Sequence, residues 1–463
     1  MQKIFDHCYD LDRRCYETFK LTEDILMEHA ADAMARHIRE RFAPGKRIVI
    51  VAGPGNNGAD GITLARLLHA DYAVSLHLPY GAKSTMAKLQ LERTLTLDVA
   101  VHEEMPKDAD IVVDAVFGAG LSKPLDEKGI AWVERMNALP GYKLACDIPT
   151  GLNDRGAPLP VAFRADATVT MGALKTALFG DAAKRYVGAV EVADLGLSRA
   201  IYEGKTNTFL LEEEDFRPPL RHDPAAHKGD FGHLCVVAGE KTGAAILAGS
   251  AGLRIGAGLV TLLCERELPT LPHSLMRSDS LPGNTTALAL GMGLGEGFDP
   301  SALALGEMPL LLDADACDRP WTASLLRRGR VVVTPHPKEF ARLLARVGIA
   351  EVDAAQIQRD RFGWARRFAE AYPDAVLLLK GANTLIAHGE TLHVNPLGTP
   401  VLSQAGSGDV LAGIIGGLLA QGVPPLEAAV QGSLALALAA RRYEGADYSA
   451  TAEDLIEGLR WLA

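Results

Sequence analysis

The sequence predicts two three-layer α/β domains, and three observations support this. The chain has 463 residues, more than one ordinary domain, so at least two hydrophobic cores are expected. Short β-branched runs alternate with longer amphipathic segments in both halves, a pattern typical of βαβ units around a mostly parallel sheet. The 46 glycines indicate many tight turns between these elements.

A polar segment, LEEEDFRPPLRHDPAAHK at 211–228, separates the two halves. It combines an acidic run with a proline pair and has no helical or strand periodicity, so we place the domain boundary there, giving domains 1–214 and 215–463. The strands expected in the first domain are 47–52, 73–78, 111–115, 143–147 and 167–171. Those expected in the second are 233–238, 259–264, 310–313, 331–334 and 376–380.

Composition excludes several classes of protein. Hydrophobic residues make up 48% and charged residues 23% of the chain, which is typical of a soluble globular protein. The net charge of -11 argues against a nucleic-acid partner. Six scattered cysteines without a CxxC pair indicate reduced thiols rather than a disulfide or zinc framework. The start, MQKIFDHCYDLDRRCYE, has no apolar signal core and no stretch is long enough to span a bilayer, so we expect a cytoplasmic protein without a membrane partner.

The first domain contains a strand, a glycine loop and a helix in RIVIVAGPGNNGADGITLARLL. Its glycines at 53, 55 and 58 satisfy the GxGxxG dinucleotide pattern, but the acidic residue that an NAD site needs after the second strand is absent from LPYG at 78–81. An ordinary Rossmann dehydrogenase is therefore disfavoured. The loop instead offers Asn56, Asn57 and Asp60, whose oxygens suit sugar hydroxyls or a hard cation.

Two further strand ends carry polar residues. Asp114 ends one predicted strand, and Asp147 and Thr150 follow the next in LACDIPTGLN. Because the carboxyl ends of neighbouring parallel strands share one crevice, we expect these side chains to meet the Asn56–Asp60 loop. A single aspartate at such a position more often caps a loop, but three at successive strand ends indicate a site.

In the second domain, VLSQAGSGDVLAGIIGGLLAQG places a glycine loop before an apolar helix. Gly406 and Gly408 allow close approach of a ligand to the backbone, and the first turn of the helix presents unpaired N–H groups beside Asp409. This arrangement favours phosphate binding next to a base. The alternative for an isolated GxGD is that the carboxylate only complements the helix dipole.

The first domain resembles the N-terminal domain of the bifunctional NAD(P)H-hydrate repair enzymes, through LMEHAADAMA, GPGNNGADG, VDAVFGAGL, DIPTGL and ADATVTMGALKTALF in that order. The resemblance implies a Rossmann-like domain and an epimerase, an isomerase that interconverts the R and S hydrates of NADH and NADPH (NADHX and NADPHX). At C6 of the hydrate this requires opening to an iminium-like form and return of water on the other face, which Asp147 would assist by acid–base catalysis beside the nicotinamide.

The resemblance also implies the residues of this site. Those that line the hydrate would be Asn56, Asn57, Gly58, Ala59, Asp60, Gly118, Ala119, Gly120, Leu121, Ser122, Lys123, Pro124 and Asp147. A potassium ion would be held by Asn57, Asp114 and Thr150. The family usually has Gly at Ala59 and Ser at Thr150; threonine keeps the hydroxyl, whereas Ala59 adds a methyl group.

The second domain resembles the ADP- or ATP-dependent NAD(P)H-hydrate dehydratases, which are lyases of the ribokinase-like fold. The matching phrases are KGDFGHLCVVAG, LAGSAGLRIGAGLV, GMGLG, LLDADACD, VVVTPHPKEFARLL, LLLKGANTLIA and SQAGSGDVLAGIIGGLLAQG, again in order. Phosphorylation of the hydrate's alcohol would turn a poor leaving group into phosphate, whose departure restores the dihydronicotinamide.

In this reading Asp409 would be the catalytic base, and the loop N–H groups would stabilise the moving phosphate. The hydrate would contact Ala244, Gly293, His336 and Asp409. ADP would be held by Lys380, Gly381, Ala382, Asn383, Thr384 and Gly408. Magnesium would be held chiefly by nucleotide phosphates and water, with Glu339 orienting a bound water. The family commonly has an aromatic residue near Lys241, which this chain lacks.

Two alternatives remain. The second half could be a ribokinase-like kinase for a small vitamin precursor, although related kinases usually have asparagine where this chain has His336. The first half could be a regulatory or protein-binding module, although the three potassium ligands argue against that. The resemblance also leads us to expect ADP as the phosphoryl donor and a homo-oligomer.

Overall fold

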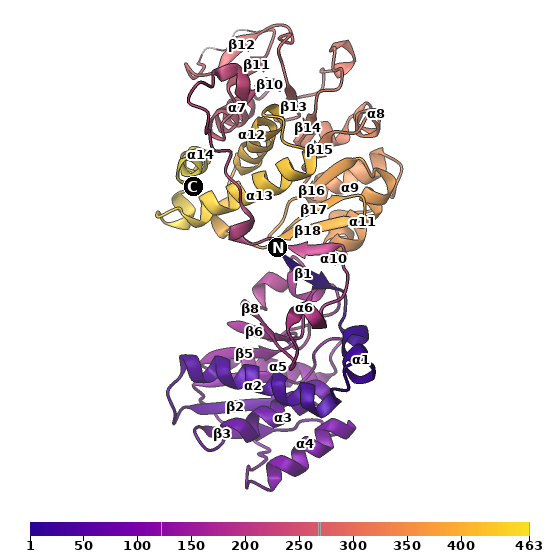
Figure 1. Ribbon diagram of the computed structural model, residues 1–463, viewed down its shortest axis with the longest axis vertical. Helices are drawn as coiled ribbons and strands as arrows, with labels where there is room; N and C mark the ends of the chain where they lie inside the picture. Colours follow the sequence, from indigo (N-terminus) through magenta and orange to yellow (C-terminus); the bar gives the residue numbers. More distant parts are fainter. Residues whose placement is uncertain (122, 267, 269, 463) are drawn as a thin grey trace. The chain divides into compact units, whose positions relative to one another are not determined.

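The computed structural model describes residues 1–121, 123–266, 268 and 270–462 and contains two compact units. One comprises Lys3–Thr206; the other comprises Asn207–Ala463 together with Met1–Gln2. Both units are α/β, as the sequence predicted, and each is built on a largely parallel sheet (Figure 1). Among the described residues, no helix is long and apolar enough to cross a membrane.

The N-terminal unit has a six-stranded parallel sheet in the order β3-β2-β4-β5-β6-β8. These strands are β2 (Arg47–Ala52), β3 (Ala73–His77), β4 (Ile111–Ala115), β5 (Tyr142–Cys146), β6 (Ala167–Met171) and β8 (Ala189–Ala193). A short parallel pair joins β1 (Gln2–Phe5) to β7 (Leu174–Lys175). The helices are α1 (Tyr9–Glu17), α2 (Glu23–Arg41), α3 (Asn56–Leu68), α4 (Thr85–Leu95), α5 (Glu127–Ala138) and α6 (Arg199–Tyr202).

Side chains along β2 alternate between two hydrophobic cores, one on each face of the sheet, which explains why helices cover both faces. Ile48 and Ile50 of β2 pack in the core beneath α2 and α3, whereas Val49 and Val51 face the core beneath α5. This period of two is the pattern of a strand that is buried on both faces. The strand order changes direction between β2 and β4, and in doubly wound sheets the crevice at such a point receives the ligand.

The C-terminal unit has a larger sheet, in which β12-β11-β10-β13-β14-β15-β16-β17-β18-β9 is the strand order. The strands are β9 (Thr208–Leu210), β10 (His233–Val237), β11 (Leu259–Leu263), β12 (Met276–Ser278), β13 (Ala287–Leu290), β14 (Leu310–Leu312), β15 (Val331–Val333), β16 (Ala375–Leu379), β17 (Thr384–His388) and β18 (Thr391–Asn395). All neighbours are parallel except β17, which is antiparallel to both β16 and β18.

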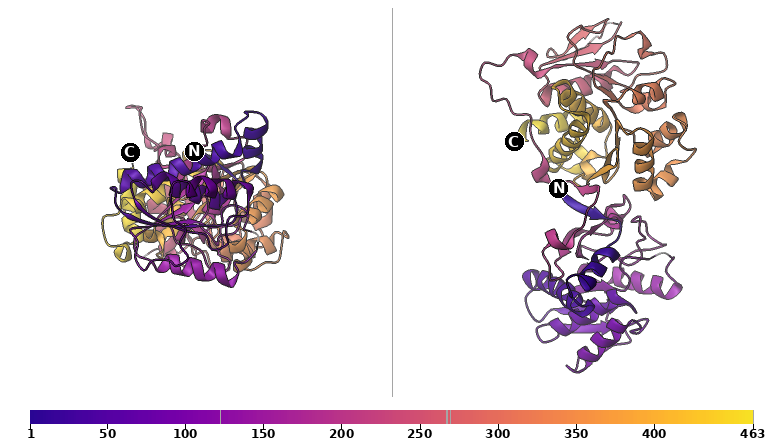
Figure 2. Two further views of the ribbon diagram at one scale, coloured as in Figure 1. Left: turned by 90° about the horizontal axis from the view of Figure 1, so that it is seen from below. Right: turned by 45° about the vertical axis from the view of Figure 1, so that its right-hand side comes forward.

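One face of this sheet packs against the C-terminal helices, drawn in yellow in Figures 1 and 2. The helices of the unit are α7 (Thr242–Arg254), α8 (Thr322–Arg327), α9 (Pro337–Arg346), α10 (Ala354–Arg359), α11 (Arg361–Ala371), α12 (Ser407–Ala420), α13 (Pro425–Arg441) and α14 (Ala452–Gly458). Helices α7 and α12 share one core with α13 and α14, while α11 lies against β16 and β17.

Candidate active sites

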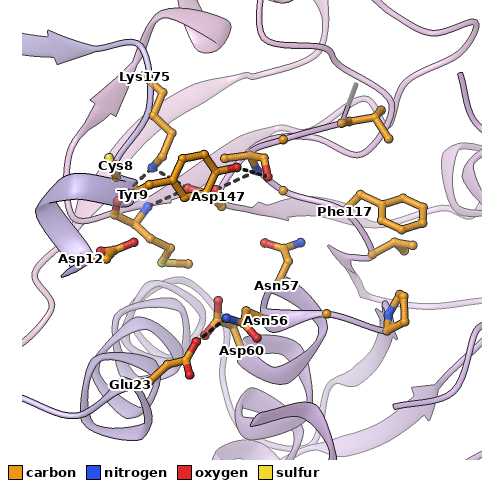
Figure 3. A pocket seen from close by; sticks show the side chains of 18 of the residues that line it. Cys8, Tyr9, Asp12, Glu23, Asn56, Asn57, Asp60, Phe117, Asp147 and Lys175 are labelled. Atoms are coloured by element: carbon orange, nitrogen blue, oxygen red, sulfur yellow. Dashed lines mark hydrogen bonds and ion pairs between the residues drawn. The ribbon is translucent and has the colours of Figure 1, made fainter. Parts of the chain in front are cut away.

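A cavity of about 730 Å³ lies at the carboxyl ends of β2, β4 and β5 in the N-terminal unit (Figure 3). The strand order of the sheet reverses between β2 and β4, and a ligand is expected at this point. Its walls come from the loops after these strands, from α1 and α3, and from the segment around β7. The lining residues are Cys8, Tyr9, Asp12, Tyr16, Glu23, Pro54, Gly55, Asn56, Asn57, Asp60, Val116, Phe117, Gly118, Ala119, Gly120, Leu121, Lys123, Asp147, Met171 and Lys175.

Two glycines allow the loop after β2 to pack tightly. A methyl group on Gly53 would lie 1.8 Å from the carbonyl oxygen of Val116, and one on Gly58 would lie 1.8 Å from the carbonyl oxygen of Gly53. Neither position has room for a side chain. The glycine pattern therefore brings the start of α3 against the end of β4, which places Asn56, Asn57 and Asp60 at the cavity.

Asp147 is the most strongly held carboxylate in this cavity. Its Oδ1 accepts hydrogen bonds from Lys175 Nζ at 2.6 Å, the backbone N–H of Met171 at 3.1 Å and the Thr170 hydroxyl at 3.2 Å, and its Oδ2 accepts one from the Ala119 N–H at 3.1 Å. Burial opposes its ionisation, but the charge of Lys175 and these hydrogen bonds hold the pKa of Asp147 below its usual value. The buried side chains of Asp147 and Lys175 thus form an ion pair.

Asp60 has a different environment. It lies in the first turns of α3 and is 8% exposed, and its Oδ2 lies 3.9 Å from the Cys146 thiol. Burial, followed by the charges of Asp147 and Asp12, raises the pKa of Asp60 well above its usual value. The cavity therefore contains one carboxyl group that favours the ionised form and one that favours the neutral form.

Of the three predicted potassium ligands, only Asn57 lines this cavity. Asp114 and Thr150 lie behind its wall, where they accept hydrogen bonds from the N–H groups of Val116 and Phe117. Asp114 is fully buried. Its Oδ1 accepts a hydrogen bond from the Thr150 hydroxyl at 2.6 Å, and its Oδ2 accepts one from the Thr150 N–H at 2.7 Å. Burial raises the pKa of Asp114 to about 6. Asn57 Nδ2 is buried and has no hydrogen-bond partner among the described residues. A buried carboxylate beside a hydroxyl offers oxygen atoms of the kind that a hard cation takes as ligands.

The structure brings most of the predicted N-terminal residues together. Asn56, Asn57, Asp60, Gly118 to Leu121, Lys123 and Asp147 line the cavity. Ser122 lies outside the described residues. Gly58, Ala59 and Pro124 are not in the lining, and Ala59 packs into the core between α3 and the sheet. The methyl group of Ala59 therefore points away from the cavity.

Sequence reasoning missed one side of this cavity. The unpredicted residues on this side are Cys8, Tyr9, Asp12, Tyr16, Glu23, Met171 and Lys175. Most belong to α1 and its surroundings, far from the other lining residues in sequence. Also not named as site residues were four neighbours of predicted residues, Pro54, Gly55, Val116 and Phe117. Lys175 follows Asp147 by 28 positions, and only its place in a strongly apolar segment, where a charged residue needs a partner, could have indicated it.

In the C-terminal unit, Asp409 lies in the first turn of α12, as predicted. The residue before this helix, Gly406, has φ +89°, a left-handed conformation that favours glycine. A methyl group on Gly408 would lie 3.5 Å from Lys380 Nζ and 4.0 Å from Asp313 Oδ2. Burial, followed by the charge of Asp313, raises the pKa of Asp409 to about 6. Asp409 is therefore suited to accept a proton near neutral pH.

Lys380 is the centre of a group of charges at the ends of β14, β15 and β16. Its Nζ lies 2.8 Å from Asp313 Oδ1 and 3.8 Å from Glu339 Oε2, and the Thr334 hydroxyl donates to Asp313 Oδ1 at 2.7 Å. Although burial opposes its charge, Asp313 and Glu339 raise the pKa of Lys380 above its usual value. The glycine loop before α12 therefore faces a fixed cation.

His336 caps α9. Its Nδ1 accepts hydrogen bonds from the N–H groups of Lys338 and Glu339, and Glu339 Oε2 accepts one from the His336 N–H at 2.8 Å. The ring Nε2 lies 3.2 Å from Glu339 Oε1. The capping box fixes the ring at the N-terminus of α9, in the loop after β15, and β15 is paired with the strand that Asp313 follows.

Gly293 packs against Lys241, the residue before α7, and Ala244 lies in the first turn of that helix. The Lys241 N–H, just before α7, donates to the Gly293 carbonyl at 3.0 Å, and a methyl group on Gly293 would lie 2.6 Å from Lys241 Cβ. Beside them is a second cavity of about 320 Å³, lined by Glu240, Lys241, Gly293, Gly295, Glu296, Asp315, Asp318, Arg319 and Arg342.

The predicted nucleotide loop, from Lys380 to Thr384, is held by a buried arginine. Arg361 of α11 donates to the backbone carbonyls of Leu379, Lys380 and Asn383. Thr384 begins β17, and Asn383 is buried. Arg361 and Asp313 were not predicted as site residues, although Asp313 follows a strand as Asp114 ends one. Among the described residues, no three His, Cys, Asp or Glu side chains form a group suited to a metal ion.

Known families match both units. The family described as "YjeF-related protein N-terminus" matches residues 23–177, and the family described as "NAD(P)H-hydrate dehydratase" matches residues 234–460. The two matches place the chain in the class of α/β enzymes that carry both domains on one polypeptide.

Full-length relatives define the family further. The bifunctional NAD(P)H-hydrate repair enzyme Nnr of Helicobacter pylori is 39% identical over 471 residues, covering 100% of each chain. That of Escherichia coli is 33% identical and covers 93% of this chain and 87% of its own. A solved ADP/ATP-dependent NAD(P)H-hydrate dehydratase of Bacillus subtilis, co-crystallised with ATP and Mg²⁺, is 26% identical over 56% of this chain and 98% of its own, with a TM-score of 0.45. The chain belongs to the family of bifunctional NAD(P)H-hydrate repair enzymes.

Proposed function

We propose that residues 1–214 are an NAD(P)H-hydrate epimerase and residues 215–463 an ADP-dependent NAD(P)H-hydrate dehydratase. The observation that carries the proposal is Asp409, a half-buried carboxylate with a pKa of about 6 behind a glycine loop and next to the Lys380–Asp313 pair. A base, an anion-binding loop and a fixed cation are the groups that phosphoryl transfer to an alcohol requires.

In the dehydratase reaction, Asp409 accepts the proton of the hydrate's hydroxyl as that oxygen takes the terminal phosphoryl group of ADP. The N–H groups at the start of α12 and the Lys380 cation stabilise the negative charge of the moving phosphoryl group. The C–O bond then breaks and phosphate leaves with the bond's electron pair, while the N1 lone pair forms an N1=C6 double bond. The released phosphate takes a proton from C5, the electrons of that C–H bond form C5=C6, N1 regains its lone pair, and the dihydronicotinamide is restored. The carboxyl proton returns to solvent.

The Lys380–Thr384 loop and Gly408 are the proposed contacts of the nucleotide. Arg361 fixes the backbone of this loop, which supports a rigid nucleotide site. Ala244, Gly293 and His336 would lie along the hydrate. A magnesium ion would be reached by the carboxylates of Glu339 and Asp313, both beside Lys380, and would offset phosphate charge when bound.

In the epimerase reaction, the N-terminal cavity would hold the hydrated nicotinamide with Asp147 beside it as the catalytic carboxylate. Asn57, Asp114 and Thr150 would hold potassium, a proposal supported by the buried Asp114 carboxylate beside the Thr150 hydroxyl. When bound, the ion would supply a fixed positive charge behind this wall of the cavity.

We further propose that the protein acts in the cytoplasm as a homo-oligomer on both NADHX and NADPHX, without nucleic acid or membrane. The six free cysteines, all buried, support a reducing compartment such as the cytoplasm, and the net charge of -11 argues against a nucleic-acid partner.

The test is to mix purified protein with R and S NADH hydrate, magnesium and potassium, and to follow the absorbance of the restored dihydronicotinamide. Full recovery, faster with ADP than with ATP, is expected. Recovery of only the S portion would remove the epimerase activity from the proposal, and a stable phosphorylated product without recovery would indicate a kinase instead.

A further inference from the structure

Inverting a hydrated carbon sets two demands on a site. The hydroxyl must be protonated to leave from one face and water must return to the other, and the nitrogen-stabilised cation formed in between must be tolerated in a partly buried place. This reasoning rests on the proposed epimerase function. The question is which side chain carries the proton and which stabilises the positive charge.

Asp147 is poorly suited to carry the proton. Both of its oxygens already accept hydrogen bonds, three on Oδ1 and one on Oδ2, and Lys175 lies 2.6 Å away with its charge buried beside it. Protonating this carboxylate would leave the Lys175 ammonium without its counter-charge in a buried place. The arrangement instead holds a permanent negative charge at the cavity wall.

Asp60 has the opposite set of neighbours. The groups that face it are carboxylates or weak acids: Asp12 and Tyr16 from α1, Glu23 from α2, and Cys146 and Asp147 from β5 and the loop after it. No cation is among the groups that act most strongly on it, and the thiol at 3.9 Å is a weak donor. The neutral carboxyl form, with one transferable proton, is the form that these neighbours favour.

The two carboxyl groups also lie on different walls of the same cavity. Figure 3 shows Asp147 and Lys175 on one side, and Asp60 on α3 on the other, with Asn57 between them. A ring bound between these walls would have a proton donor toward one face and a fixed negative charge toward the other.

We propose that Asp60 is the group that transfers the proton in the N-terminal cavity, and that Asp147, tied to Lys175, acts as a fixed negative charge. Asp60 gives its proton to the C6 hydroxyl while the C6–O bond breaks, and the electron pair of that bond leaves with water. The N1 lone pair forms the N1=C6 double bond, and the resulting cation lies next to Asp147. A water then adds to the opposite face, N1 regains its electron pair, and the proton that this water sheds returns to the Asp60 carboxylate through the water released first.

The experiment measures interconversion of pure R NADH hydrate to the S form by chromatography, on the full-length protein without nucleotide, as a function of pH. Since the protonated form of Asp60 starts the reaction, kcat/KM for the wild-type protein should fall about tenfold per pH unit above the pKa of Asp60. Asp60→Asn should lose about 100-fold or more in rate, together with this pH dependence.

Two matched variants separate this role from loss of a nearby charge. Asp147→Asn should slow the reaction but keep the fall at high pH, since the proton donor remains. Glu23→Gln removes one negative charge facing Asp60, so the same fall should shift to lower pH. Dehydration of the S hydrate with ADP should be unchanged in Asp60→Asn, which reports that the C-terminal unit is folded, and urea unfolding at neutral pH reports whether the N-terminal unit is folded.

The outcomes are distinguishable. A wild-type protein that does not interconvert the hydrates would overturn the proposed epimerase function and this inference with it. If the wild-type protein interconverts them, a rate for Asp60→Asn within threefold of wild type would overturn only the role of Asp60. A wild-type rate of interconversion that does not change at high pH would also overturn the role of Asp60, and this measurement needs no variant.

Discussion

At the scale of single residues, the Asp147–Lys175 pair shows how the N-terminal cavity keeps a charge inside the protein. Removing one partner leaves the other buried and uncompensated, so Asp147→Asn and Lys175→Met should each lower the free energy of unfolding by about 3–5 kcal/mol. Because the pKa of Asp147 is lowered in the folded state, this contribution is present above the unfolded pKa of about 4 and is lost as the pH falls through the folded pKa.

The measurement is a double-mutant cycle by urea unfolding at neutral pH. The double variant should lose less than the sum of the two single losses. Asp60→Asn is the control, because a carboxyl group that is already neutral should be replaced at a cost under about 1 kcal/mol. Additive losses for Asp147 and Lys175 would mean that the ion pair has no cooperative role.

The pKa of Asp409 leads to a prediction for the C-terminal site. As a base it works only when ionised, so dehydration of the S hydrate should rise with pH through about 6 and level off above that value. Asp409→Asn should lose at least about 100-fold in rate and still bind ADP, because the shape of the loop is kept. The pH–rate profile and nucleotide titration check this, and full turnover by the variant would exclude Asp409 as the base.

Individual side chains also show what a sequence can predict. Asp114, Asp147 and Asp409 could be singled out because each lies at the end of a recognisable strand or at the start of a recognisable helix. Asp12 could not, because nothing near it in sequence indicates a ligand. The apolar segment around Lys175 indicates only that this lysine needs a partner, and which segments the fold brings to Asp147 and Asp60 decides the role of both residues.

At the scale of elements, α7 and α12 meet through glycines, which sets the position of the Asp409 helix. A methyl group on Gly413 of α12 would lie 2.0 Å from the carbonyl oxygen of Ala248 in α7, so the two helices are in backbone contact there. Gly413→Ala should therefore lower stability by about 1–3 kcal/mol and also slow dehydration, because α12 carries Asp409. Thermal unfolding and the S-hydrate assay measure both effects.

Gly243→Ala is the matched control for this prediction. A methyl group at Gly243, also in α7, meets no atom within 4 Å, so stability should change by less than about 1 kcal/mol. If Gly413→Ala behaved like Gly243→Ala, close packing of the two helices could not be what positions Asp409.

All ten predicted strands are present, within a residue at either end, because buried parallel strands produce continuous β-branched runs. Strands such as β13, β17 and β18 were missed. In β13 the alanines hide the β-branched run that marks a buried strand. Strands β17 and β18 form an antiparallel extension of the sheet, and their pairing depends on the free edge of β16. The loops at the carboxyl ends of the parallel strands were the predictable part of both sites, since parallel strands must bring them to one edge.

At the scale of the whole molecule, two compact units each have their own site, and the chain belongs to a family in which both domains occur together. The central claim is that the N-terminal site supplies the epimer that the C-terminal site consumes. The S hydrate should therefore be able to leave the N-terminal site and enter the C-terminal site.

The measurement that tests it most directly is recovery of NADH from pure R hydrate, with ADP, magnesium and potassium, by Asp147→Asn, by Asp409→Asn and by an equimolar mixture of the two. Each variant alone should recover little NADH, Asp147→Asn should still convert the S hydrate at the wild-type rate, and the mixture should convert the R hydrate. Equal loss of R and S conversion in Asp147→Asn, or a mixture no better than its parts, would contradict the assignment of the two activities to two separate sites.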